Sequence, residues 1–289
     1  MAIGYLNGEF LPLEQARVPV LDRGFLFGDG VYEVIPVFGG RLFRLTQHLH
    51  RLNASLQAVR IRNPMSESAW AALLGTLVTR NGGGEQSIYL QVTRGVAKRD
   101  HVPSEPLTPT VFGMATRVEA GRAVIPVSAV VREDIRWQRC DIKSIGLLAN
   151  VLMRIEAADA GAYEAILIRD GKVTEGAASN VFVVLDGVVR TPPKGHALLP
   201  GITRDLILEL LGEAGIAYRE TEVSRLELQR AEEIWLSSSV RELLPVVELD
   251  GRSVGGGVPG PLWERTSRLY QAFKSRAFVE NAGVANHRG

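Results

Sequence analysis

One lysine, Lys143, lies where the chain passes from a polar run, Gln138 to Asp141, into an apolar segment that begins at Ile145. The apolar residues that follow recur at helical spacing and predict a buried helix: Leu147, Leu148, Val151, Leu152 and Ile155. A lysine at the entrance to a buried helix is partly desolvated, which favours the neutral amine that forms a Schiff base with a carbonyl. The alternative is a surface lysine one residue before an N-cap at Ser144, which is the commoner arrangement.

A lone carboxylate and several anion-binding signals follow Lys143 along the chain. Glu175 precedes a run of small residues that would let a flat ligand approach the backbone, although a solvated glutamate at a hairpin end is the alternative. Thr203 lies at the start of a predicted helix, where free N–H groups favour an anion, unless it serves only as an N-cap. Ser237-Ser-Ser follows a predicted strand and forms a second candidate anion nest. Arg51 supplies a fixed cation for a phosphate or lies on a solvated helix face.

Composition and charge exclude several functional classes. The chain has 289 residues with 33 basic and 32 acidic side chains, a balance that gives no reason to expect a nucleic-acid partner. No stretch approaches the roughly 20 apolar residues of a membrane helix. A single cysteine, Cys140, excludes an intrachain disulfide framework and favours a cytoplasmic location. We expect no metal site.

Strands and helices are expected in both halves of the chain, with a domain boundary between residues 118 and 119. Asn7-Gly8, Asp170-Gly171 and Asp186-Gly187 are typical hairpin turns, so the sheets are predicted to be largely antiparallel rather than doubly wound. The sequence thus predicts a mixed α+β fold, with one domain over residues 1–118 and a larger one over residues 119–289 that carries Lys143.

Several motifs of the chain resemble those of one enzyme family. The run from Glu175 through Asn180, Arg190-Thr191 and Gly201-Ile-Thr-Arg is similar to the signature of class IV aminotransferases, which are pyridoxal 5′-phosphate (PLP) enzymes of fold type IV. Within that class the D-amino-acid aminotransferases are the most similar. The closer match is carried by the segments 22–34, 91–95, 133–144 and 163–167, and the similarity covers essentially the whole chain.

The resemblance implies a small α/β domain, a larger barrel-like domain, PLP in the cleft between them, and a homodimer. It implies that Lys143 carries the cofactor as a Schiff base and then moves the proton between Cα and C4′, while Glu175 keeps the pyridine nitrogen protonated. The residues expected to bind the cofactor's phosphate and ring are Arg51, Leu199, Ile202, Thr203, Ser238 and Ser239. The residues expected to face the substrate are Tyr32, Arg136, Arg99 and His101, the last two as a trap for its carboxylate.

Three departures from the family pattern bear on the substrate. Ala177 and Ala178 stand where close relatives carry serines, and charged Lys98 and Asp100 flank Arg99. Arg241 follows the serine run, where it binds a second carboxylate or pairs with Glu242.

The expected activity is amino transfer from a D-amino acid similar to D-alanine to a 2-oxo acid such as 2-oxoglutarate. Alternatives in the same fold are a branched-chain L-amino-acid aminotransferase, an (R)-amine transaminase and an aminodeoxychorismate lyase. An alternative from another class is an inactive homologue that acts as a dimeric binding protein.

Overall fold

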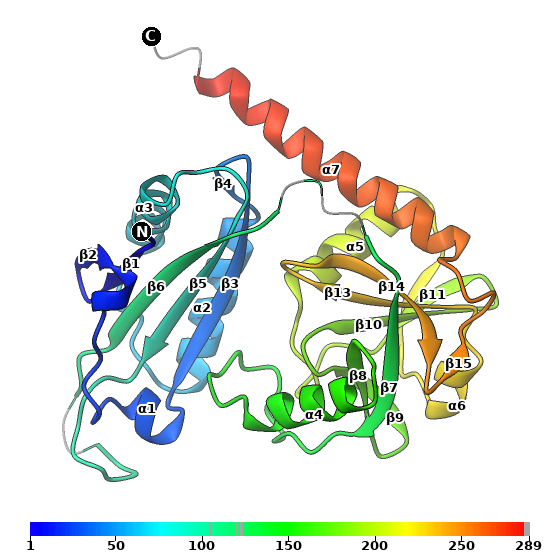
Figure 1. Ribbon diagram of the computed structural model, residues 1–289, viewed down its shortest axis with the longest axis horizontal. Coiled ribbons are helices and arrows are strands. Elements are labelled where there is room, and N and C mark those ends of the chain that lie inside the picture. Colours follow the sequence, from blue (N-terminus) through cyan, green and yellow to red (C-terminus); the bar gives the residue numbers. More distant parts are fainter. Residues whose placement is uncertain (104–105, 120, 122–123, 286–289) are drawn as a thin grey trace. The chain divides into compact units, whose positions relative to one another are not determined.

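The computed structural model describes residues 1–103, 106–119, 121 and 124–285, the last nine without their side chains. The chain divides into two compact units, one formed by Met1–Arg122 with Ile142–Leu147 and the other by Ala123–Asp141 with Leu148–Gly289 (Figure 1).

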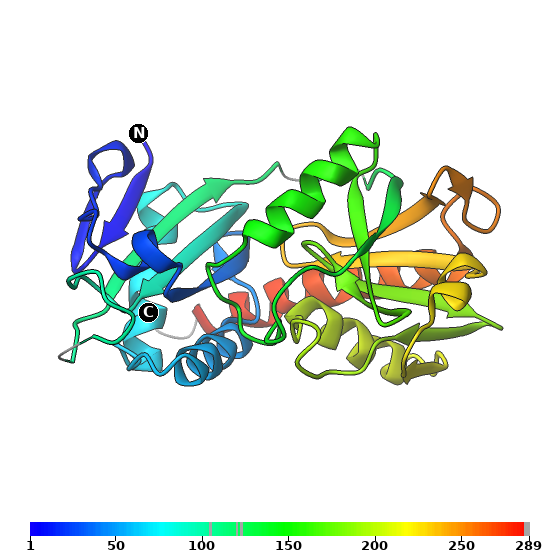
Figure 2. The same cartoon turned by 90° about the horizontal axis from the view of Figure 1, so that it is seen from below.

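The first unit is an antiparallel sheet covered by two helices. Its elements are β1 (Ile3–Leu6), β2 (Glu9–Pro12), a 3-10 turn (Leu13–Gln15), α1 (Arg23–Phe27), β3 (Gly30–Phe38), β4 (Arg41–Leu42), α2 (Leu45–Ala58), α3 (Glu67–Arg80), β5 (Gln86–Thr93) and β6 (Thr110–Arg117). The strand order is β2-β1-β6-β5-β3-β4, and α2 and α3 lie on the same face of this sheet (Figures 1 and 2). Leu52, Leu74 and Ile88, all fully buried, lie in one core between helices and sheet.

The second unit is a larger mixed sheet with helices around it. Its elements are β7 (Val127–Glu133), α4 (Leu148–Asp159), β8 (Glu164–Arg169), β9 (Lys172–Gly176), β10 (Asn180–Leu185), β11 (Val188–Thr191), α5 (Ile202–Glu213), β12 (Tyr218–Glu220), α6 (Arg225–Gln229), β13 (Glu233–Ser238), β14 (Glu242–Leu249), β15 (Arg252–Ser253) and α7 (Pro261–Ala285). The strand order is β12-β11-β10-β13-β14-β7-β8-β9, with β15 beside β14. Most neighbours are antiparallel, but β7 runs parallel to both β14 and β8.

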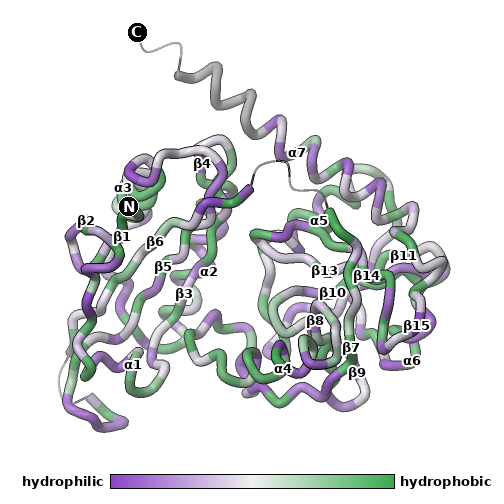
Figure 3. Tube along the Cα trace, viewed as in Figure 1, coloured by the Kyte–Doolittle hydropathy of each residue, from purple (hydrophilic) through white to green (hydrophobic). Residues whose placement is uncertain are grey.

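The expected hairpin turns are present. Asp170 and Asp186 have φ of 52°, and glycines with positive φ follow them, as a type I′ turn requires. Hydrophilic and hydrophobic residues alternate along the coloured part of α7 (Figure 3), in which Thr266 and Tyr270 are completely or almost completely buried. The mixed α+β class with largely antiparallel sheets is therefore confirmed.

The segment that carries Lys143 belongs to the first unit, whereas the sequence placed it in the C-terminal domain. Tyr32 N donates to Lys143 O at 2.9 Å, and Ile145 N donates to Gly30 O at 3.1 Å. The lysine segment thus pairs with the start of β3 through an isolated antiparallel bridge between Val31 and Ser144. The pairing joins residues more than 100 positions apart, and no local pattern could indicate it.

The helix after Lys143 differs from the prediction. It begins only at Leu148, so Ser144 is not its N-cap. The predicted buried stripe is exposed instead, with Leu148 72%, Val151 49%, Leu152 44% and Ile155 51% accessible. The face that packs on the second sheet carries Met153 and Ala157. Helical spacing shows that an apolar face exists, but it does not show what covers that face.

Candidate active site

Lys143 is held above the ring of Tyr32 in the first unit. Its Nζ lies 4.1 Å from the ring centroid, a distance at which a cation is attracted to the ring face. The backbone N–H of Lys143 donates to Ser55 Oγ of α2 at 3.2 Å. The lysine is therefore fixed from two sides, by β3 and by α2, which is not the arrangement of a mobile surface lysine.

A buried ion pair lies beside this lysine segment. Glu33 of β3 is fully buried, and Arg51 of α2 donates to both of its carboxylate oxygens, from Nε at 2.8 Å and from Nη2 at 2.9 Å. His48, one turn earlier on α2, lies 2.7 Å from Glu33 Oε2 through Nδ1. Arg51 is therefore not on a solvated helix face. It is a fixed, oriented cation, as a phosphate-binding role would require.

The pKa values of Glu33 and His48 follow from this geometry. Burial alone would raise the pKa of Glu33, but the charge and hydrogen bonds of Arg51 and His48 outweigh burial and hold that pKa far below its ordinary value. Burial lowers the pKa of His48, and the neighbouring Glu33 offsets this only in part. We therefore assign Glu33 as ionised and His48 as neutral near pH 7.

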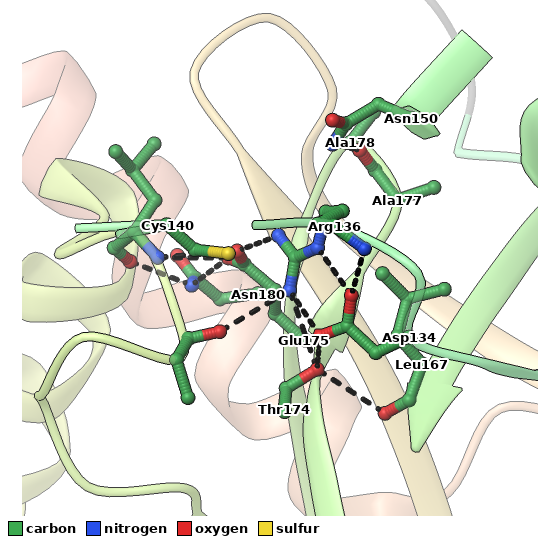
Figure 4. Close-up of polar contacts among 12 residues, drawn as sticks. Asp134, Arg136, Cys140, Asn150, Leu167, Thr174, Glu175, Ala177, Ala178 and Asn180 are labelled. Carbon is green, nitrogen blue, oxygen red and sulfur yellow. Dashed lines mark hydrogen bonds and ion pairs between the residues drawn. The ribbon is translucent and has the colours of Figure 1, made fainter. Parts of the chain in front are cut away.

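Glu175 of β9 is buried in the second unit among several donors (Figure 4). Leu199 N lies 3.1 Å from both carboxylate oxygens, and Asn180 Nδ2 lies 3.1 Å from Oε2. Nη1 of Arg136 contacts Oε1 directly. The solvated hairpin glutamate is excluded, because Glu175 is only 5% exposed. The result is an oriented carboxylate in a site of low dielectric.

Arg136 is held in place by a second carboxylate. Asp134 accepts from Arg136 Nε and Nη2, each at 2.9 Å, and the carbonyl of Ala197 accepts from Nη2 at 3.2 Å. Burial would lower the pKa of Arg136, but Asp134 and Glu175 together raise it above its ordinary value. The sequence placed Arg136 in the outer, substrate-facing part of the site. In the structure Arg136 is the ion-pair partner of Glu175 (Figure 4).

The beginning of α5 and the end of β13 form a polar site suited to an anion. Gly201 is the N-cap of α5 and gives no side-chain cap, so Ile202 and Thr203 are the first helical residues and Thr203 is not the cap. A Cβ at Gly201 would lie 1.9 Å from Asn180 Oδ1, so only glycine fits. Asn180 pairs with Ser237 across the sheet, and the buried Ser237 Oγ has no hydrogen-bond partner among the described residues.

These features fit a phosphate group. Free N–H groups and the dipole at a helix N-terminus favour an anion, and a buried hydroxyl without a partner calls for an acceptor. The predicted ligands Ser238 and Ser239 follow directly, at the end of β13 and in the turn after it. Glu242, beyond that turn, binds Gln271 Nε2 and Lys274 Nζ of α7, so the pairing of Arg241 with Glu242 that the sequence allowed is not seen.

Arg99 and His101 lie in the exposed loop after β5, in the first unit. The Arg99 guanidinium carbon is 5.4 Å from the centroid of the Phe27 ring, and the His101 ring centroid is 5.6 Å from it. Asp100 Oδ1 accepts the N–H of Val102 at 3.0 Å, which directs that carboxylate into its own turn. Among the described residues no carboxylate pairs with Arg99. Asp100, the acidic residue next to it, therefore does not neutralise the Arg99 guanidinium.

The sequence prediction missed several side chains that orient the predicted site residues. Glu33 and Asp134 each pair with an arginine, and His48 contacts Glu33; none of the three was singled out. The signal for His48 was weak but present, because His48 and the predicted Arg51 are three residues apart on one helix face. Ala177, a departure from the family pattern, packs in a small apolar cluster with Met153, where a serine hydroxyl would be buried.

Comparison with known proteins identifies the family. Residues 30–249 match the family Amino-transferase class IV, and the chain belongs to that family. It is 42% identical over 278 residues to the D-alanine aminotransferase of Bacillus licheniformis, covering 96% of this chain and 97% of that protein. It is 38% identical over 283 residues to the D-alanine aminotransferase of Staphylococcus aureus strain COL, covering 97% of this chain and 99% of that protein.

Solved structures of similar fold are aminotransferases as well. The branched-chain amino acid aminotransferase of Escherichia coli superposes with a TM-score of 0.88 at 30% identity, covering 94% of this chain and 93% of that one. The branched-chain aminotransferase of the thermophilic archaeon Thermoproteus uzoniensis, solved with norvaline, gives a TM-score of 0.85 at 27% identity, covering 94% of each chain. These likenesses confirm the fold type IV architecture expected from the sequence.

The burial of His48 makes stability depend on pH, because burial lowers the pKa of its imidazole and Glu33 offsets this only in part. The pKa of His48 is lowered from 6.5 on folding, so below about pH 6.5 the unfolded chain binds a proton that the folded chain excludes. Stability therefore falls on acidification, by up to about 1.4 kcal/mol per pH unit for one group. The pKa of Glu33 is lowered from 4.5, so the stability it contributes is lost only below about pH 4.5. In His48→Gln the loss between pH 6.5 and 5 should shrink, measured by urea unfolding; equal pH slopes in both proteins would contradict this.

Proposed function

We propose that this chain is a PLP-dependent aminotransferase that moves an amino group between a D-amino acid similar to D-alanine and a 2-oxo acid such as 2-oxoglutarate. The similarity to D-alanine aminotransferases over nearly the full chain carries the proposal. The retained Lys143 and the buried Glu175 support an active enzyme over a binding homologue that has lost activity.

The chemistry of the residues in each unit suits the parts of the cofactor that they would bind. Ile202 and Thr203 at the helix start, with Ser238 and Ser239, would hold the phosphate, and Arg51 would add its charge. Glu175 would face the ring nitrogen, and Leu199 would pack against the ring. When bound, PLP supplies an electron-withdrawing ring that stabilises negative charge developing at the substrate Cα.

The protein's own part of the reaction is to place and move a proton. Lys143 Nζ, once released from the cofactor, would take the proton from the substrate Cα and deliver it to C4′ of the cofactor, since a neutral amine in a partly dry site is an effective base. Tyr32 would keep that amine in place by the contact already seen between them. Arg99 and His101 would bind the substrate carboxylate, for which an arginine fork is well suited.

A branched-chain L-amino-acid aminotransferase is the second candidate, because the Escherichia coli enzyme of that kind shares the fold at 30% identity. The D- and L-enantiomers of alanine, glutamate and leucine as donors distinguish the two, with 2-oxoglutarate as acceptor and pyruvate when glutamate is the donor. We expect turnover with the D-enantiomers. Faster turnover of L-leucine than of D-alanine would assign the enzyme to the branched-chain class.

Lys143→Ala serves as the matched loss-of-function variant in that assay. It should fold, fail to hold PLP covalently, and lose transamination by several orders of magnitude. Lys172→Ala, which removes an exposed lysine paired with Glu222, is the control and should retain full activity. Near-normal turnover by Lys143→Ala would sink the assignment of the lysine.

Glu175→Gln tests the ring-nitrogen role. A neutral amide cannot stabilise a protonated ring nitrogen, so Cα proton removal should slow by about 100-fold or more, with modest loss of PLP affinity. Single-turnover absorbance with D-alanine measures this step. Glu164→Gln, which alters another buried carboxylate of the same unit, controls for effects on folding. Unchanged single-turnover rates in Glu175→Gln would make Glu175 a structural residue.

A homodimer is part of the proposal and is supported by exposed apolar residues. The face of α4 formed by Leu148, Val151, Leu152 and Ile155 is amphipathic and uncovered, and a second copy of the same face would pair with it about a two-fold axis. Leu148→Glu/Leu152→Glu should shift sedimentation at micromolar concentration towards the monomer. Leu226→Glu, which changes an exposed leucine on α6, should not, and a dimer that persists in the α4 variant would exclude this face.

The cytoplasm is the proposed location, supported by the single free cysteine. Among the described residues no helix combines the length and apolar character needed to cross a bilayer.

A further inference from the structure

The short helix α1 lies against the loop that carries Arg99 and His101, and its position is set by local bonds. Asp22 caps the helix by accepting the N–H of Gly24 at 2.8 Å and also accepts the hydroxyl of Thr110 at 2.7 Å. A Cβ at Gly24 would lie 2.3 Å from Thr93 Cγ2, so glycine is required for this close approach. The start of α1 is therefore fixed to β5 and β6.

Arg23, the first residue of α1, binds the backbone of the loop. It is 4% exposed, and its Nη1 donates to the carbonyl of Asp100 at 2.5 Å while its Nη2 donates to that of His101 at 3.0 Å. Its Nε donates to Asp29 Oδ2 at 2.8 Å. One buried guanidinium thus spans two consecutive carbonyls of an otherwise exposed loop, a geometry that the planar fork of arginine provides and lysine does not.

Phe27, the last residue of α1, supplies a ring that meets both side chains of the loop. Arg99 and His101 contact it at 5.4 and 5.6 Å, and the Arg23 guanidinium carbon lies 4.8 Å from the same centroid. The negative face of an aromatic ring attracts a guanidinium, so the ring orients the Arg99 fork.

We propose that Arg23 and Phe27 are positioning residues that hold Arg99 and His101 in the orientation needed to bind the α-carboxylate of the substrate. The inference deepens the proposed function and rests on the carboxylate-binding role assigned there to Arg99 and His101. It gives a task to the segment Asp22–Asp29, which the sequence singled out as part of the family resemblance but for which it offered no role.

The physical effect is preorganisation. Residues 98–102 are all exposed or half-buried, so without Arg23 and Phe27 the loop would have to be ordered when the carboxylate binds. Ordering a long side chain on binding costs free energy, and ordering a loop segment costs more. The loss should therefore appear in substrate affinity and leave the chemical step at Lys143 unchanged.

The experiment uses the holoenzyme with Arg23→Gln, Phe27→Leu and Arg99→Ala. Arg94→Gln is the matched control, because Arg94 also pairs with Asp29 but donates its other hydrogen bonds to the carbonyls of Val59 and Arg60 instead of the loop. The readouts are KM and kcat for D-alanine, and Ki for propionate, a carboxylate without an amine. Thermal unfolding and the PLP absorption spectrum report on folding.

We expect Arg23→Gln to raise KM and the propionate Ki about tenfold, a change of about 1.4 kcal/mol, and Phe27→Leu to raise them severalfold. In both, kcat should stay within about twofold, while Arg94→Gln should match the wild type in Ki. Phe27→Leu keeps the apolar bulk and decides the question alone if Arg23→Gln does not fold.

Two results would overturn the proposal while leaving the proposed function intact. One is an unchanged Ki in Arg23→Gln and Phe27→Leu when Arg99→Ala raises it; the other is an equal rise in Arg94→Gln. An unchanged Ki in Arg99→Ala would remove the carboxylate-binding role and this inference with it, and the test of D- against L-donors would still judge the class of enzyme.

Discussion

A buried carboxylate is stable only when hydrogen-bond donors surround it. In the second unit, several segments meet at Glu175 to supply these donors. Its partners come from three separate stretches: Arg136 after β7, Asn180 at the start of β10, and the backbone of Leu199 before α5. Because each partner is fixed by its own strand or turn, the carboxylate has one orientation. The same bonds bring the end of β9 and the beginning of α5 together, so the proposed ring-nitrogen and phosphate sites share one support.

The charge of Arg136 is held by carboxylates of the protein itself. Two carboxylates, Asp134 and Glu175, share its guanidinium, and all three side chains are at most 6% exposed. A buried arginine with two acidic neighbours keeps its charge under any physiological condition, because losing the proton would take a cationic partner away from both buried carboxylates. Arg136 therefore helps to fix the direction of the Glu175 carboxylate.

In the first unit, carboxylates also orient arginines. Glu33 orients Arg51 with two hydrogen bonds, as Asp29 orients Arg23 and Arg94. In both cases a carboxylate that is at least partly buried fixes the direction of an arginine, and the other donors of Arg23 and Arg94 bind backbone carbonyls of other segments. Lys143 differs, since its side chain contacts a ring and its position depends on the backbone bridge between Ser144 and Val31 of β3. Cations in this unit are thus positioned before any substrate arrives, which reduces the ordering needed on binding.

The sequence by itself determined the family, the mixed class of fold and the hairpin turns, because these depend on local residue types such as Asp170-Gly171 and on a motif of contiguous residues around Glu175. It also indicated most of the candidate site residues, through their order along the chain. It could not show that the lysine segment pairs with β3, that Arg136 pairs with Glu175, or that Arg23 holds the loop of Arg99. It predicted burial for the apolar face of α4 although that face is exposed. Only the tertiary structure decided these, because each depends on contacts between residues that are distant in sequence. A local pattern of residue types indicates what kind of partner a face can bind, but it does not identify the segment that packs there.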